Sequence, residues 1–147
     1  MYGVSSHVDF GHSSRRHCFT EGTMTASTQI LGSRGESIAE ALLRRKGHAV
    51  LARNYRDPVS RCEIDLITRD GDELVFVEVK AGTGRRFGDP QSRVDARKQR
   101  HIARAARRFL QERRWHETPC RFDVIGIDLS RNPPGVTHLE HAFWSAV

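Results

Sequence analysis

Residues 63–80 read EIDLITRDGDELVFVEVK, which contains two β-strand patterns separated by Asp70-Gly71. The second pattern, residues 74–80, is dominated by β-branched and aromatic residues, and successive side chains of a strand point to opposite faces. Glu78 and Lys80 therefore share one face, while the valines at positions 75, 77 and 79 share the other. The pattern predicts two charged groups on one face of an otherwise apolar strand.

The acidic residues of the two strands are expected to meet across the turn. If Asp70-Gly71 forms a two-residue hairpin turn, Asp65 lies opposite Phe76 and diagonal to Glu78. Converging carboxylates on a half-buried strand pair are costly unless a cation lies between them, and they suit a hard ion such as Mg²⁺, or Mn²⁺. The alternative is an ordinary solvent-exposed hairpin face, in which each cross-strand charge pair contributes about 0.2–1 kcal/mol.

A third carboxylate is expected from the first helix. Ser33-Arg34-Gly35-Glu36 matches a capping box, an apolar stripe follows it, and Gly47 is placed to end the helix. On a helical wheel Glu36 borders the apolar stripe, whereas Glu40 lies further round toward solvent, which favours Glu36 as the residue near the sheet. The capping box is the structural alternative for Glu36, and Glu63, on the face of Asp65, is the second choice of ligand.

The positive charge of the chain is concentrated in one stretch. The net charge is +6, and residues 85–114 hold eleven Lys and Arg against three acids. Apolar positions at a helical spacing predict a long helix over residues 93–114, with a second stripe of arginines on another face. Such a stripe suits phosphate groups, although a solvated helix face would look the same. The nucleic-acid-binding residues predicted here are Arg85, Arg86, Arg97, Arg100, Arg104 and Arg107.

Lys98 belongs to the apolar stripe of the same helix, four residues before Ile102. It is expected to point toward the sheet, where it would either reach a phosphate near the metal or lie along the edge of the core. We include it among the nucleic-acid-binding residues.

The remaining patterns predict one domain with an α/β fold. Strands are expected at residues 48–54, 61–69, 73–80 and 122–127, with a strand or turn at 136–144, and this order gives an α/β sandwich with a mixed sheet. Residues 1–29 are rich in Ser, Gly, Thr and His and are predicted to be a flexible extension, leaving 30–147 as the folded domain. The three scattered cysteines favour a reducing cytoplasm, and no apolar stretch is long enough for a membrane helix.

The spacing of Asp65 and Glu78-Val79-Lys80 resembles the PD-(D/E)xK signature of the restriction-endonuclease-like fold. More narrowly, the chain resembles the YraN-like family, which is similar to the Holliday junction resolvases. The motifs that carry this likeness are Gly32 to Glu36, Gly47, Asn54-Tyr55-Arg56, Glu63 to Ile67, Phe76 to Lys80, Phe87-Gly88 and Lys98. One departure is Cys62, which stands where the family usually has Gly.

The resemblance implies a nuclease-like domain and a metal-dependent endonuclease acting on DNA, in preference to RNA, and on branched or structured forms of it. It implies Glu36, Asp65, Glu78 and Lys80 as catalytic residues, with the three acids binding Mg²⁺ or Mn²⁺. It also allows a homodimer, since resolvases act as dimers on a symmetric junction. Two alternatives are a non-catalytic nucleic-acid-binding module with a vestigial nuclease site, and a protein whose arginine helix binds an acidic partner.

Overall fold

The computed structural model describes residues 26–83 and 94–145, which form two helices and five strands. In chain order the elements are α1 (Ala26–Arg45), β1 (Ala49–Arg56), β2 (Glu63–Asp70), β3 (Glu73–Gly82), α2 (Ala96–Arg113), β4 (Cys120–Asp128) and β5 (Gly135–Phe143). The segment that the sequence left as a strand or a turn is a strand, β5.

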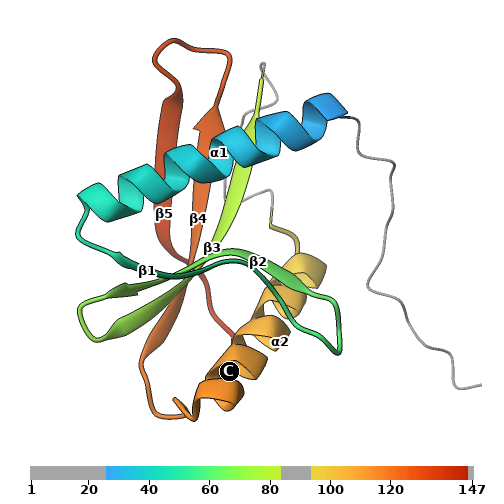
Figure 1. Ribbon diagram of the computed structural model, residues 1–147, viewed down its shortest axis with the longest axis vertical. Coiled ribbons are helices and arrows are strands. Elements are labelled where there is room, and N and C mark those ends of the chain that lie inside the picture. Colours follow the sequence, from blue (N-terminus) through green and yellow to red (C-terminus); the bar gives the residue numbers. More distant parts are fainter. Residues whose placement is uncertain (1–25, 84–93, 146–147) are drawn as a thin grey trace, which may run out of the picture.

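The five strands form one sheet in the order β1-β2-β3-β4-β5 (Figure 1). β3 and β4 run parallel, and the other neighbouring strands run antiparallel. A parallel pair needs a long crossover connection, and α2 lies in the one between β3 and β4. The predicted α/β fold with a central mixed sheet flanked by helices is therefore confirmed, and it is consistent with a restriction-endonuclease-like sandwich.

Two separate cores lie on the two faces of the sheet, and β3 contributes to both. Phe76 packs with Phe109 of α2, with the ring planes nearly perpendicular and the centroids 6.0 Å apart. Val77 points the other way and packs with Ala39 and Leu43 of α1. Because both faces of β3 are covered, Glu78 near the end of this strand is buried, while Lys80 two residues further on is partly exposed.

The register of the β2–β3 hairpin differs from the expected one by two residues. Asp70 pairs with Glu73, so the turn lies one residue further along the chain than predicted. Phe76 pairs with Ile67 and not with Asp65, which was the expected partner. A shift of two residues keeps every side chain on its face, because the side-chain period of a strand is two. The predicted convergence of the acidic groups therefore survives the error in register.

Helix α1 begins earlier than the sequence suggested. It starts at Ala26, so the predicted capping box at Ser33 is wrong, and residues 26–29, assigned to a flexible extension, are helical. The predicted end at Gly47 is correct: this residue has φ +95°, and its amide and that of His48 donate to the carbonyls of Arg44 and Leu43. This pattern of bonds is a Schellman motif. Residues 1–25 lie outside the described part of the chain.

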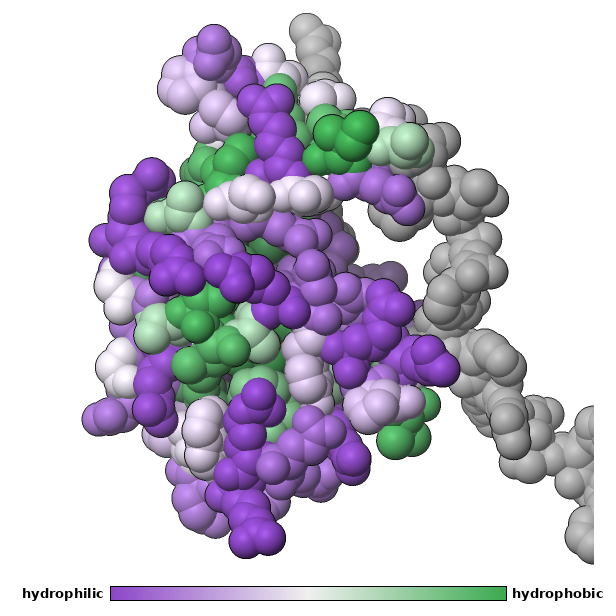
Figure 2. All heavy atoms as spheres, in the orientation of Figure 1, coloured by the Kyte–Doolittle hydropathy of each residue, from purple (hydrophilic) through white to green (hydrophobic). Residues whose placement is uncertain are grey.

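Figure 2 shows hydrophilic side chains over most of the face crossed by α1, with hydrophobic ones in small separate groups. This face therefore lacks the broad apolar patch typical of a permanent protein interface. Among the described residues, neither helix is long and apolar enough to span a membrane.

Candidate functional site

Glu78 is a buried carboxylate whose ion-pair partners, among the residues that the structure describes, are two lysines. It lies on β3 and is 2% exposed. Lys80, two residues along the same face, donates to its Oε1, and Lys98 Nζ from α2 lies 3.0 Å from its Oε2. Among the described residues, Oε2 is nevertheless a buried oxygen without a well-aligned hydrogen-bond donor, so the Lys98 ammonium compensates its charge mainly as an ion pair. A buried acceptor left in this way is costly, and it marks a place where a further positive group would be stabilised.

Asp65 lies beside Glu78 where β2 and β3 separate. The regular pairing of these strands ends at Leu66 and Val77, and beyond it the amide of Val79 donates to Asp65 Oδ2 at 2.7 Å. Figure 1 shows the divergence, with β3 continuing along β4 while β2 turns away. The side chain thus takes the place of a strand carbonyl. Burial, with the nearby Glu78 charge adding to it, raises the pKa of Asp65 to about 7.

Glu36 approaches the same region from α1. Gly35, the residue before it, is buried, and a Cβ atom there would lie 2.2 Å from Cβ of Ala81, so α1 and β3 are in close contact at this point. Burial raises the pKa of Glu36, a hydrogen bond with Asn54 opposes the rise, and the charges of Glu63 and Glu78 add to it. Glu36 therefore lies within electrostatic range of the cluster.

The alternative residue on α1, Glu40, is engaged elsewhere. It binds Arg53 at 2.6 Å and Arg44 at 2.9 Å, and these two guanidinium groups lower its pKa to about 2. The geometry thus favours Glu36 over Glu40. Glu63, the second choice of ligand, forms an ion pair with Arg56 at 2.8 Å.

The carboxylates that the structure brings together are Asp65 and Glu78. Over residues 26–83 and 94–145, no group of three or more His, Cys, Asp or Glu side chains is close enough to hold a metal ion. Two carboxylates are nevertheless a common protein contribution to a Mg²⁺ site, because this ion keeps several waters and often binds phosphate oxygens. The acceptor Glu78 Oε2, which lacks a well-aligned donor, fits such an ion, whereas the part of Glu36 as a ligand stays a prediction.

The arginine stripe lies on the outside of α2. Arg97, Arg100, Arg104 and Arg107 are all exposed, while Lys98 is partly buried. Burial alone would lower the pKa of Lys98, but the charges of Glu78 and Asp65 outweigh it and raise the pKa. Lys98 thus reaches the acidic pair, whereas the arginines face solvent. Arg85 and Arg86 lie outside the described residues.

Asn54 is a site residue to which the sequence analysis gave no role. It has φ +46° on β1 and hydrogen-bonds Glu36. Asn is among the few residues that adopt this conformation readily. An Asn at the end of a strand pattern was the available signal, but its partner on α1 is distant in sequence.

Together these features define a small α/β protein with two acids and two lysines gathered where two strands diverge. The chain matches the model of the family described as "Uncharacterised protein family UPF0102" over residues 35–127. It therefore belongs to this family, the YraN-like family that its motifs resemble.

UPF0102 proteins from three bacteria are similar to this chain over nearly their whole length. The protein from Geobacter metallireducens is 42% identical over 120 residues, covering 82% of this chain and 97% of that protein. The protein from Pseudomonas aeruginosa is 41% identical, covering 80% and 94%, respectively. The protein from Moorella thermoacetica is 39% identical, covering 82% and 100%.

Proposed function

We propose that this protein is a metal-dependent endonuclease that hydrolyses phosphodiester bonds in DNA, with branched or otherwise structured DNA as its preferred substrate. The observation that carries the proposal is the cluster of Asp65, Glu78, Lys80 and Lys98, in which two carboxylates, one partly buried and one buried, meet two ammonium groups and one carboxylate oxygen lacks a well-aligned donor. A buried charge cluster at a strand end contributes little to stability, so it is better explained by chemistry.

Each member of the cluster has a part in this reaction. Asp65 and Glu78 would hold Mg²⁺ or Mn²⁺, with Glu36 completing or tuning the site. When bound, the ion polarises the phosphate and makes water a better nucleophile. Lys80 is held at the mouth of the site by Glu78, where its ammonium group orients the water or stabilises negative charge on the phosphate in the transition state.

A cleavage panel tests this function. Purified protein is incubated with single-stranded, duplex, flap and four-way DNA in Mg²⁺, Mn²⁺ or EDTA, and cleavage is expected only with metal. Lys80→Met should reduce the rate by roughly 10²-fold, as for the loss of one electrostatic group in a transition state. Lys46→Met is the matched control, because Lys46 binds Glu140, away from this cluster.

Melting temperatures of both variants separate chemistry from folding. Lys80 is one of two lysines that contact buried Glu78, so its loss is expected to cost some stability. Rates are therefore compared at a temperature at which both variants are folded. Undiminished cleavage by Lys80→Met would exclude this mechanism.

The second candidate is a nucleic-acid-binding module that does not cleave. The exposed arginines of α2 support it. Metal-independent binding without cleavage of any substrate in the panel would select this function over the first.

Both candidates predict that the arginine stripe binds phosphates. Replacing Arg97, Arg100, Arg104 and Arg107 with Gln should weaken DNA binding regardless of sequence. The slope of log affinity against log salt should fall by up to roughly one unit for each phosphate that the variant no longer binds. Fluorescence anisotropy with labelled DNA at several salt concentrations measures this slope.

Calorimetric titration with Mn²⁺ is the control for the four-arginine variant, since Asp65 and Glu78 remain in place. An unchanged salt slope would mean that the stripe is only a solvated surface.

A further inference from the structure

A pocket of about 310 Å³ adjoins the acidic cluster on the side of α2. Its walls come from the turn between β1 and β2 and from the first turns of α2. The lining residues are Arg61, Cys62, Glu63, Asp95, Arg97, Lys98 and His101. Lys98 is shared with the cluster, because its Nζ lies 3.0 Å from Glu78 Oε2. Anything bound in the pocket is therefore next to the proposed reaction centre.

The acidic residues of the pocket are already engaged within the protein. Glu63 binds Arg56, and Asp95 accepts from the amide of Lys98 as the N-cap of α2. By contrast, no carboxylate of the described residues forms an ion pair with Arg61 or Arg97. The pocket thus contains three cationic side chains, those of Arg61, Arg97 and Lys98, against the carboxylates of Glu63 and Asp95, which already have partners within the protein. This arrangement favours an anionic ligand.

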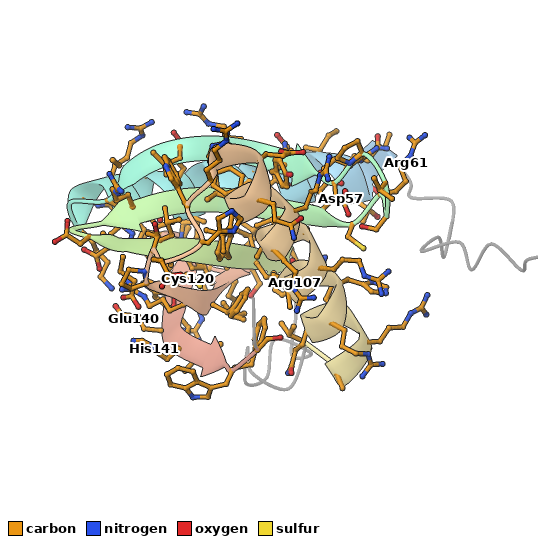
Figure 3. The ribbon with its side chains drawn as sticks, turned by 90° about the horizontal axis from the view of Figure 1, so that it is seen from below. Asp57, Arg61, Arg107, Cys120, Glu140 and His141 are labelled. Atoms are coloured by element: carbon orange, nitrogen blue, oxygen red, sulfur yellow. The ribbon has the colours of Figure 1, made fainter. Side chains whose placement is uncertain are left out.

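The turn that carries Arg61 is rigidly held. Asp57 is 3% exposed and its carboxylate accepts from the amides of Val59 and Ser60 and from the Ser60 hydroxyl. The amide of Arg61 donates to Asp57 O at 2.8 Å, and Arg61 has φ +60°. Figure 3 shows Asp57 and Arg61 together at one end of the sheet, with Arg107 further along α2. Arg61 is therefore presented by a fixed turn, which lowers the entropy cost of binding.

We propose that this pocket binds one strand of nucleic acid, with Arg61 and Arg97 each on one of the two phosphates nearest the scissile one. With a volume of about 310 Å³, the pocket can take in only a small part of a nucleic acid. An unpaired nucleotide can enter it without the opening of a duplex, so we assign to it a single-stranded segment, such as a flap or an unpaired arm. Only the position of the pocket relative to a cleaved phosphate rests on the proposed function. Binding of the strand does not require cleavage.

The test uses the full chain, EDTA to prevent cleavage, and two fluorescein-labelled probes, a single-stranded DNA 12-mer and a blunt duplex of the same sequence. Arg61→Gln with Arg97→Gln should weaken binding of the single strand about tenfold and lower its salt slope by about 1.4, since each phosphate bound on a single strand contributes about 0.7. Binding of the duplex should weaken much less, because there the variant loses at most the one phosphate contact that Arg97 makes as part of the arginine stripe. Arg45→Gln, an exposed arginine at the far end of α1, should change neither.

An unchanged salt slope on the single strand, or an equal loss of affinity on the duplex, would overturn the proposal. Arg61→Gln alone should give about half the change in slope, which shows that the turn contributes beyond the helix. These outcomes can be distinguished from those of the cleavage panel. If the wild-type protein cleaves DNA but the double variant keeps the wild-type salt slope, only the pocket proposal is rejected. If the salt slope of the double variant falls but the wild-type protein cleaves no substrate, only the nuclease proposal is rejected.

Discussion

In metal-free buffer at about pH 8, Asp65→Asn is expected to stabilise the protein, and with Mg²⁺ present it is expected to abolish cleavage. Asn keeps the oxygen that accepts from the Val79 amide and removes a charge placed beside Glu78. Losing one metal-binding carboxylate removes several kcal/mol of transition-state stabilisation, and hence roughly 10³-fold or more in rate. A variant that is more stable and inactive is the result expected of a functional residue.

The pH dependence of this stabilisation has a definite sign. The folded pKa of Asp65 is about 7, raised from an ordinary value of 3.8 by burial and by the Glu78 charge. When folding raises the pKa of a carboxyl group, its contribution to the free energy of unfolding is fully present below the pKa of the unfolded state. This contribution is lost as the pH rises toward and through the pKa of the folded state. Asp65→Asn should therefore add on the order of 4 kcal/mol at about pH 8, given a rise of about three pKa units at about 1.4 kcal/mol each, and almost nothing at about pH 4.

Thermal unfolding in EDTA across this pH range measures the effect. Asp72→Asn is the matched control, because Asp72 is exposed in the β2–β3 turn and loses the same charge. Added Mn²⁺ should raise the melting temperature of the wild-type protein and of Asp72→Asn, and not of Asp65→Asn. A destabilised or fully active Asp65→Asn variant would contradict the assignment.

The acidic cluster was predictable because it depends on strand parity more than on register. Alternation in residues 74–80 determines the face of Glu78, and a two-residue error in the turn leaves Asp65 on that face. The register itself was not predictable in the same way, because either two-residue turn near Gly71 satisfies the hydrophobic pattern.

Other parts of the site depend on packing between distant segments. Lys98 was placed correctly toward the sheet from helical periodicity, yet its ion pair with Glu78 requires the packing of α2 on β3. The start of α1 was missed, since residues 26–32 form no apolar stripe and the capping signal at Ser33 is stronger than any signal before it. The pocket beside Arg61 could not be inferred at all, because a turn and a helix far apart in the sequence form it.

Arg121, on β4, lies in a second charged network, at the opposite end of the β2–β3 hairpin from the proposed site. Its guanidinium group is 7% exposed and lies 3.0 Å from Asp70, 2.6 Å from Glu73 and 3.2 Å from Asp123. Asp123 is completely buried and also binds His138 at 2.9 Å. The network joins the hairpin end to β4 and β5, so we assign it to stability.

Arg121→Met is expected to destabilise the protein by about 3–5 kcal/mol at neutral pH, because it leaves Asp123 charged and buried without its main cation. Burial alone would raise the pKa of Asp123, but hydrogen bonds from His138 and the His141 amide, with the charge of Arg121, hold it below its ordinary value. The stability that this carboxylate contributes is present above an unfolded pKa of about 3.9 and is lost as pH falls through the lower folded value.

The difference between wild type and Arg121→Met should therefore shrink as pH falls below about 4, where protonation removes the stranded charge. Urea unfolding at a series of pH values measures this difference. The double variant Arg121→Met with Asp123→Leu should recover part of the loss, since an apolar pair can replace a buried ion pair without leaving a charge behind. A loss that is independent of pH and unrelieved by Asp123→Leu would mean that Arg121 acts through its packing alone. DNA binding and metal titration should be unchanged in folded Arg121→Met, because none of its partners belongs to the acidic cluster or to the pocket.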